Sequence, residues 1–77
     1  MDTKTKVAEI LAKVKPSRNL EGVTDIIEGG YLDSFELIAL ISALQESFGI
    51  VIEVDDITPE NFNSAAAMTA MVDRLRG

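Results

Sequence analysis

The chain has 77 residues, a formal net charge of −6, and neither cysteine nor histidine. A chain this short forms one domain, 1–77, which buries only roughly 60 % of its unfolded surface, so its core is small. Without cysteine, neither a disulfide nor a zinc cluster can hold the fold. The common general base and the thiol nucleophile are also missing, which argues against autonomous catalysis. We therefore expect a non-catalytic protein whose helices are held together by packing alone.

Acidic and basic residues are segregated along the sequence. Every basic residue lies near one of its ends: Lys4, Lys6, Lys13, Lys15, Arg18, Arg74 and Arg76. From 19 to 73 all charged residues are acids: Glu21, Asp25, Glu28, Asp33, Glu36, Glu46, Glu53, Asp55, Asp56, Glu60 and Asp73. Such a surface repels phosphate backbones and anionic lipids, so we expect no binding to nucleic acid. It favours a partner that carries a basic patch. The alternative is that the acids serve solubility, which explains the net charge but explains the segregation less well.

No apolar run approaches the ~20 residues that a membrane-spanning helix needs, and segment 1–15 lacks a signal-peptide pattern. The sequence therefore predicts a cytoplasmic protein without membrane insertion. We expect it to be a monomer.

The first predicted helix covers residues 3–14. Its apolar residues follow the i, i+3, i+4, i+7 spacing of an amphipathic helix: Val7, Ile10, Leu11 and Val14. Thr3 and Thr5 are the candidate N-caps. An irregular connection follows over 15–33, which is longer than most loops. It should either serve a function or pack through its apolar residues, which are Leu20, Val23, Ile26, Ile27 and Tyr31.

The second predicted helix, 34–48, has the sequence "SFELIALISALQESF", and Gly49 is placed to end it. Its apolar stripe consists of Leu37, Ile41, Leu44 and Phe48, broadened by Ile38 and Leu40. The segment 50–54 alternates like a strand, with Ile50, Ile52 and Val54 on one side, but it has no pairing partner. We therefore interpret it as an extended loop.

Two further helices complete the predicted fold. Thr58 as N-cap and Pro59 at the first helical position indicate a short helix over 58–62. A helix over 64–75, capped by Asn63 or Ser64, carries Met68, Met71, Val72 and Leu75 at helical spacing, mainly as core residues. The predicted fold class is all-α, a small four-helix bundle with three longer helices, one short helix and a long first loop.

A calcium loop counted from Asp25 places Gly30 at position six and Glu36 at position twelve, as an EF-hand requires. However, positions three and five are Ile27 and Gly29, which offer no side-chain oxygen, and no helical pattern precedes Asp25. We therefore predict no metal site.

Ser34 has two interpretations. In the first, Asp33 and Glu36 form a D-x-x-E capping box, and Ser34 is an ordinary first-turn residue. This leaves unexplained why a small hydroxyl occupies the helix start and why an acidic field surrounds it. It also leaves unexplained the glycine pair Gly29 and Gly30, which would keep the approach open. In the second interpretation, Ser34 is there to be modified.

The segment "DSFELIALISALQESFGI" resembles the attachment segment of acyl, aminoacyl and peptidyl carrier proteins, which bear 4′-phosphopantetheine. Their pattern is Asp-Ser-Leu at a helix start, then aliphatic residues at helical spacing, a phenylalanine and a short acidic stretch. Ser34 matches the modified serine, Asp33 the preceding acid, and Phe35 takes the usual leucine position. "ITPENFNSAAAM" resembles the turn into the family's third and fourth helices. The similarity covers essentially the whole chain, including the apolar positions Leu37, Ile38, Leu40, Ile41, Leu44 and Phe48.

The resemblance implies the acyl-carrier-protein fold and a carrier role. A phosphopantetheinyl transferase would move 4′-phosphopantetheine from coenzyme A to Ser34, and the thiol of this arm would carry acyl or aminoacyl groups as thioesters. Loading and acyl-transfer enzymes with basic patches would read the acidic helix, with Asp33, Glu36 and Phe35 near the arm and Glu46 further along.

The type of carrier follows from smaller differences. Three residues separate the glycine pair from Ser34, which favours an acyl-carrier or D-alanyl-carrier type over a peptidyl carrier. Ala39 stands where fatty-acid carriers usually keep a glutamate, which favours a specialised carrier for a polyketide, aminoacyl or D-alanylation-like pathway. A long acyl chain would need an apolar pocket lined by Ile38, Ile41, Ile52 and Met68. The alternative function is an unmodified acidic helical module that binds a basic partner through the same face.

Overall fold

The computed structural model describes residues 2–77, and within this range the chain is all-helical, with no strand. This confirms the predicted bundle of three longer helices and one short helix. The single-turn 3₁₀ helix was not predicted. The elements are α1 (Thr3–Val14), α2 (Ser34–Phe48), the 3₁₀ helix η1 (Val54–Asp56), α3 (Pro59–Phe62) and α4 (Ala65–Arg76).

Each of the four α-helices begins at a polar side chain that accepts a hydrogen bond from the first turn. Thr58 caps α3 with Pro59 directly after it, as predicted, and Ser64 rather than Asn63 caps α4. The predicted caps of α1 are wrong. Asp2 caps it, accepting from the Thr5 backbone N–H at 2.8 Å, because the cap lies one residue before the helix and Thr3 is already inside it.

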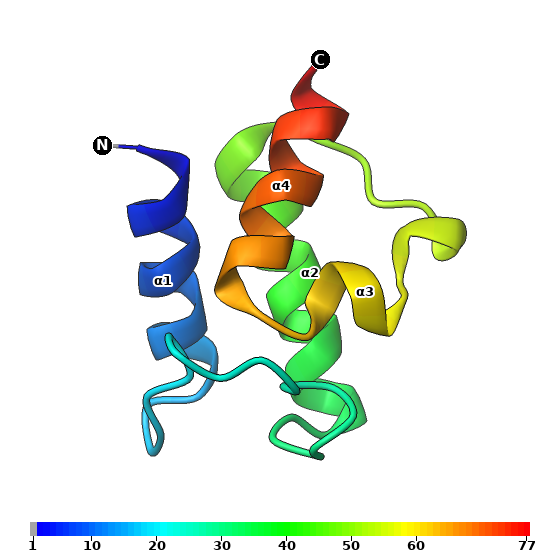
Figure 1. The fold of residues 1–77 in the computed structure, drawn as a ribbon. Helices are drawn as coiled ribbons and strands as arrows, with labels where there is room; N and C mark the ends of the chain where they lie inside the picture. The colour runs from blue at the N-terminus through cyan, green and yellow to red at the C-terminus, as the bar shows by residue number, and fades with distance from the viewer. Residues whose placement is uncertain (1) are drawn as a thin grey trace.

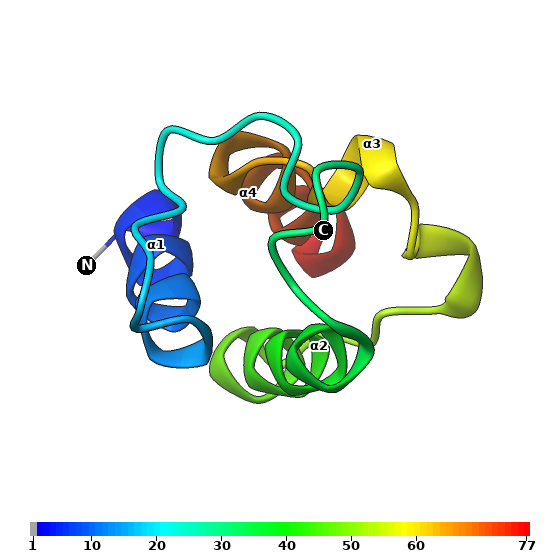
Figure 2. The ribbon, with the colours of Figure 1, turned by 90° about the horizontal axis from the view of Figure 1, so that it is seen from below.

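The three longer helices surround a common core. α1 packs against α4 and α2, and α3 packs against α4. Viewed end-on, α1, α2 and α4 occupy three sides of the molecule, and the connection between α1 and α2 crosses one end (Figure 2). α2 starts at this end, so Ser34 lies at the end of the bundle where that connection arrives (Figure 1).

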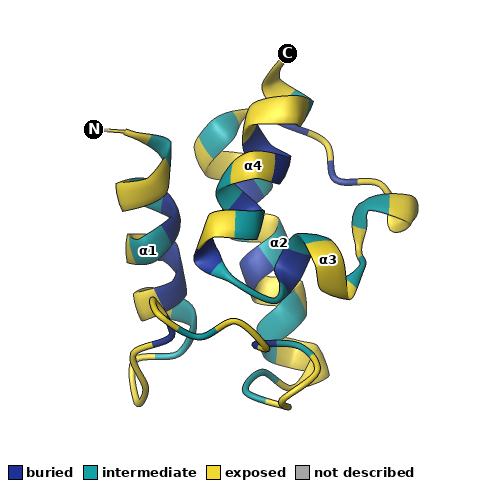
Figure 3. Ribbon diagram, viewed as in Figure 1, coloured by how far each residue is buried: buried dark blue, intermediate teal, exposed yellow. Residues whose placement is uncertain are grey.

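The core is built from buried residues of the four α-helices and the first connection (Figure 3). The largest are Phe62, Ile26, Leu40, Leu44, Met68 and Met71. Burying each contributes roughly 1.5–3 kcal/mol relative to leaving it exposed. Both methionines are at 0 % exposure, as predicted for core residues, and their unbranched side chains fit an irregular interior.

Both the connection between α1 and α2 and the segment after α2 pack against the core through buried apolar side chains. The long one, 15–33, packs down through Leu20 and Ile26, as predicted. The segment after α2 runs extended until η1, with Ile50 and Ile52 buried. The alternation predicts that Val54 lies on the same side as Ile50 and Ile52, and this prediction is wrong. Val54 is 83 % exposed, because the chain turns into η1 at this residue.

Candidate functional site: the first turn of α2

Ser34 is the first residue of α2 and is exposed. The capping box predicted for this turn is present: the Glu36 N–H donates to Asp33 Oδ1 at 2.7 Å, and the Asp33 N–H donates to Glu36 Oε1 at 3.0 Å. The side chains of Asp33 and Glu36 therefore provide acceptors for each other's backbone N–H group at the helix start. The capping box does not use the Ser34 hydroxyl. The two interpretations of this turn are compatible, because its cap and its candidate modification site are different residues.

Glu36 faces α1 rather than open solvent. Both of its carboxylate oxygens accept from Lys15 Nζ at 3.2 Å, and its side chain is 23 % exposed. Lys15 directly follows α1, so this ion pair ties the end of one helix to the beginning of the next. The predicted partner-binding role of Glu36 thus competes with two internal roles, in the cap and in the ion pair.

The solvent face of α2 carries the other predicted contact residues. Phe35 is 81 % exposed and Glu46 is exposed three turns further on. Between them lie Ile38, which is 63 % exposed, and the exposed Ala39 and Ser42. These five residues, here called the outer face, place two large apolar side chains beside Ser34 and one carboxylate at the far end.

The glycine pair before Ser34 has a local structural cause. Residues 26–31 form a helix-like turn in which the Tyr31 N–H donates to the Ile26 carbonyl and the Gly30 N–H to the Ile27 carbonyl, each at 3.1 Å. Gly30 sits at φ +73°, and a Cβ on Gly29 would lie 2.7 Å from the Asp25 carbonyl oxygen. Both positions therefore require glycine for the turn itself. An open approach to Ser34 is not needed to explain them.

One residue that the sequence did not single out for this site is Asn63, predicted only as a possible cap. It lies between α3 and α4 and hydrogen-bonds the turn 26–31. Its partners are 35 and 36 residues away in sequence, so no local pattern could have revealed the contact.

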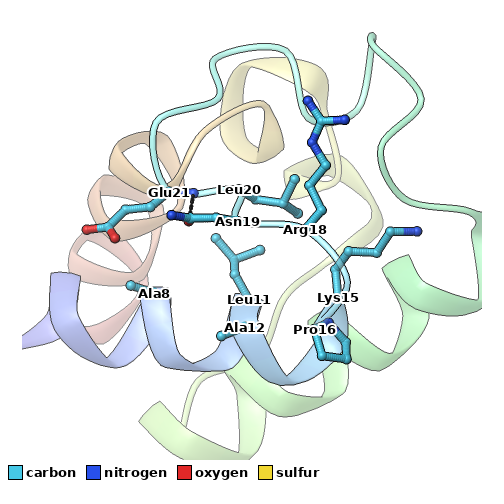
Figure 4. A pocket seen from close by; sticks show the side chains of 9 residues that line it. All are labelled: Ala8, Leu11, Ala12, Lys15, Pro16, Arg18, Asn19, Leu20 and Glu21. Carbon is cyan, nitrogen blue, oxygen red and sulfur yellow. Dashed lines mark hydrogen bonds between the residues drawn. The ribbon is translucent and has the colours of Figure 1, made fainter.

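The side chains proposed to line an acyl pocket do not share one. Ile38 points to solvent, whereas Ile52 is 8 % exposed and Met68 is fully buried. A hollow with a volume of about 230 Å³ lies elsewhere, between α1 and residues 15–21 (Figure 4). Its lining includes Leu11, Lys15 and Leu20 but not Ser34.

Among residues 2–77, no three acidic side chains gather closely enough to hold a metal ion, and no helix is both long and apolar enough to cross a membrane. Neither a protein-family model nor a curated protein matches this chain.

Proposed function

We propose that the protein is a carrier that bears 4′-phosphopantetheine on Ser34 and passes acyl or aminoacyl groups between partner enzymes as thioesters. The observation that supports this most directly is the first turn of α2. Asp33 and Glu36 cap the helix, and this leaves an exposed serine hydroxyl at its first position, flanked by exposed Phe35. An ordinary helix start needs the cap but not the serine.

In the proposed modification, the Ser34 oxygen attacks the phosphorus of coenzyme A that bears the pantetheine. A phosphodiester forms, adenosine bisphosphate leaves, and the transferase accepts the serine proton. The new phosphodiester would sit at a helix N-terminus, where free backbone N–H groups and the helix dipole favour an anion. The arm would supply the thiol that this cysteine-free chain lacks. The chain itself remains a non-catalytic tether that raises the effective concentration of its cargo.

The partner surface that we propose is the outer face of α2. Phe35 and Ile38 offer apolar area next to the arm, and Glu46 together with the acidic field of residues 19–73 attracts a basic patch on the partner. Glu36 contributes to the orientation of this helix through Lys15 rather than as a free contact. Partner binding should therefore be transient and sensitive to salt.

The carrier type that fits best is a specialised acyl or D-alanyl carrier of the cytoplasm with the acyl-carrier-protein fold. The spacing from the glycine pair to Ser34 and the alanine at position 39 support this assignment. The exposed position of Ile38 favours a small cargo, because this side chain does not help to enclose a long acyl chain.

The test is incubation of the chain with a broad-specificity phosphopantetheinyl transferase and coenzyme A, followed by intact mass measurement. We expect a gain of one phosphopantetheine in the native chain and none in Ser34→Ala. Ser42→Ala is the matched control, since Ser42 is also an exposed serine of α2, and it should gain the group fully. A folded native chain without any gain would contradict the carrier function.

The second candidate is an unmodified acidic interaction module, which the capping box favours because it accounts for Asp33 and Glu36 without any modification. This function predicts that Ser34→Ala still binds and serves the basic partner. The carrier function predicts that the same variant is folded but inactive.

A further inference from the structure

Asn63 joins the α3–α4 junction to the connection that leads to Ser34. Its side-chain Oδ1 accepts from the backbone N–H groups of Ile27 at 2.9 Å and Glu28 at 3.1 Å, and its Nδ2 donates to Glu28 Oε1 at 2.8 Å. Its backbone carbonyl accepts from the Ile26 N–H at 2.9 Å. Three consecutive backbone N–H groups of the connection are thus satisfied by this one residue.

These bonds fix the start of the turn 26–31. Because the turn leads directly to the start of α2, they also restrain the backbone before Ser34. The bonds from Tyr31 to Ile26 and from Gly30 to Ile27 close the turn on itself, so its two ends move together. Tyr31 is followed after one residue by Asp33, the cap of α2. The Arg18 guanidinium lies over the Tyr31 ring, 4.6 Å from its centroid.

Removal of the Asn63 side chain would leave the N–H groups of Ile27 and Glu28 without their protein acceptor. Both N–H groups would donate to water instead. Because Glu28 is exposed, this can happen without unfolding of the core. The buried Ile26, the Asn63 backbone carbonyl and the packing of Ile27 and Tyr31 against the core would remain, but the side-chain bonds that hold the backbone at Ile27 and Glu28 would be lost. The turn and the backbone before Ser34 would then sample several positions.

We propose that Asn63 is a positioning residue for the modification of Ser34, because its side chain holds the 26–31 turn, and through it the backbone that leads to Ser34, in the arrangement that the modifying enzyme recognises. This inference rests on the proposed carrier function. Asn63 touches neither the serine nor the arm, so it acts on the fraction of chains ready to dock rather than on the chemical step.

The inference predicts a particular kinetic change in Asn63→Ala. Because only the docking-competent fraction binds, the KM of the transferase for the chain should rise on the order of tenfold while kcat stays unchanged. Hydrogen exchange at the amides of Ile27 and Glu28 should accelerate in the same variant. A general loss of structure would instead accelerate exchange in the core helices as well.

A charge-conserving exchange tests the bonds themselves. Asn63→Asp keeps the acceptor for both N–H groups but sets a carboxylate against Glu28, so we expect an intermediate KM. Adding Glu28→Gln restores a donor–acceptor pair with the roles reversed and returns the net charge to that of the native chain. This double variant should recover KM to within about twofold of the native value. Glu28→Gln alone shows the effect of the lost charge.

Asn61→Ala is the matched control. Asn61 lies on α3, donates to the Asp56 carbonyl at 2.8 Å and accepts from Arg74 at 2.9 Å, away from the turn 26–31. Asn61→Ala should therefore leave the KM of the transferase for the chain near the native value. Three results would overturn the inference. The first is a native KM in Asn63→Ala despite faster exchange at Ile27, and the second is a KM of the double variant as high as that of Asn63→Ala. The third is an equal rise of KM in Asn61→Ala.

A native chain that is never modified would overturn the carrier function instead. The exchange data would then still show whether Asn63 holds the turn.

Discussion

The inner and outer faces of α2 carry apolar side chains in opposite surroundings. Leu40 and Leu44 on the inner face are fully buried, whereas Phe35 and Ile38 on the outer face are 81 % and 63 % exposed. Glu36, between the two faces, pairs with Lys15 and is less exposed than its apolar neighbour Phe35. The fold uses the inner face and the charge of Glu36, so the exposed apolar area of the outer face remains for a partner.

The largest difference between the faces should appear in stability. Leu44→Ala leaves a cavity in the core and should lower the free energy of unfolding by about 2–5 kcal/mol. Ile38→Ala removes a mostly exposed side chain and should change it by less than about 0.5 kcal/mol. Urea denaturation followed by circular dichroism measures both. Similar losses in the two variants would show that the outer face also contributes to the core.

The next largest effect should appear in docking. Phe35→Ala should lower kcat/KM for the transferase on the order of tenfold, because a large side chain beside Ser34 becomes buried on contact. The unfolding midpoint should not change. Val54→Ala, which removes an equally exposed side chain from η1, tests whether position beside Ser34 matters more than exposed apolar area in general. Equal losses of kcat/KM in Phe35→Ala and Val54→Ala would show that the outer face has no particular role in docking.

Asp33 serves the fold through its cap, and two substitutions separate this from its charge. Asp33→Ala should cost about 1 kcal/mol of stability, whereas Asp33→Asn should keep nearly all of it because asparagine caps equally well. If the transferase reads the charge, both variants should be modified more slowly. Thermal unfolding and modification rates measured on the same samples decide between the roles. Native modification rates in Asp33→Asn would assign Asp33 to the cap alone.

The smallest effect should come from the ion pair between α1 and α2. Lys15→Gln should lower stability by about 0.2–1 kcal/mol at low salt, and this difference should shrink at high salt. Lys13→Gln is the control, since Lys13 is exposed at the end of the same helix. A loss in Lys15→Gln that does not depend on salt would mean that Lys15 acts through packing of its aliphatic stem.

The parts of the fold that could be predicted from sequence are those encoded locally. The spacing of Val7, Ile10 and Leu11 and the sequence Thr58–Pro59 specify helices without reference to the rest of the chain, and both helices are present. The capping box at Asp33 and Glu36 is equally local. Even so, the cap of α1 was misplaced, because Asp2, Thr3 and Thr5 all have suitable side chains and sequence alone does not fix the first helical residue.

The contacts around Ser34 that were missed are all distant in sequence. Lys15 and Glu36 are 21 residues apart, and no pattern in either segment indicates that α1 ends beside the start of α2. The same holds for Asn63 and the turn 26–31. The apolar character of Ile38 suggests a place in an acyl pocket between the helices, whereas the structure places this side chain in solvent. Tertiary packing decided each of these cases.

The most direct test of the central claim locates the added group on the chain after treatment with the transferase and coenzyme A. Trypsin is unsuitable, because no lysine or arginine lies between Arg18 and Arg74. Cleavage after glutamate separates the peptide 29–36, in which Ser34 is the only serine. The carrier function predicts that tandem mass spectrometry finds the whole phosphopantetheine gain on this peptide, at Ser34. A modified chain whose peptide 29–36 carries no added mass would contradict it.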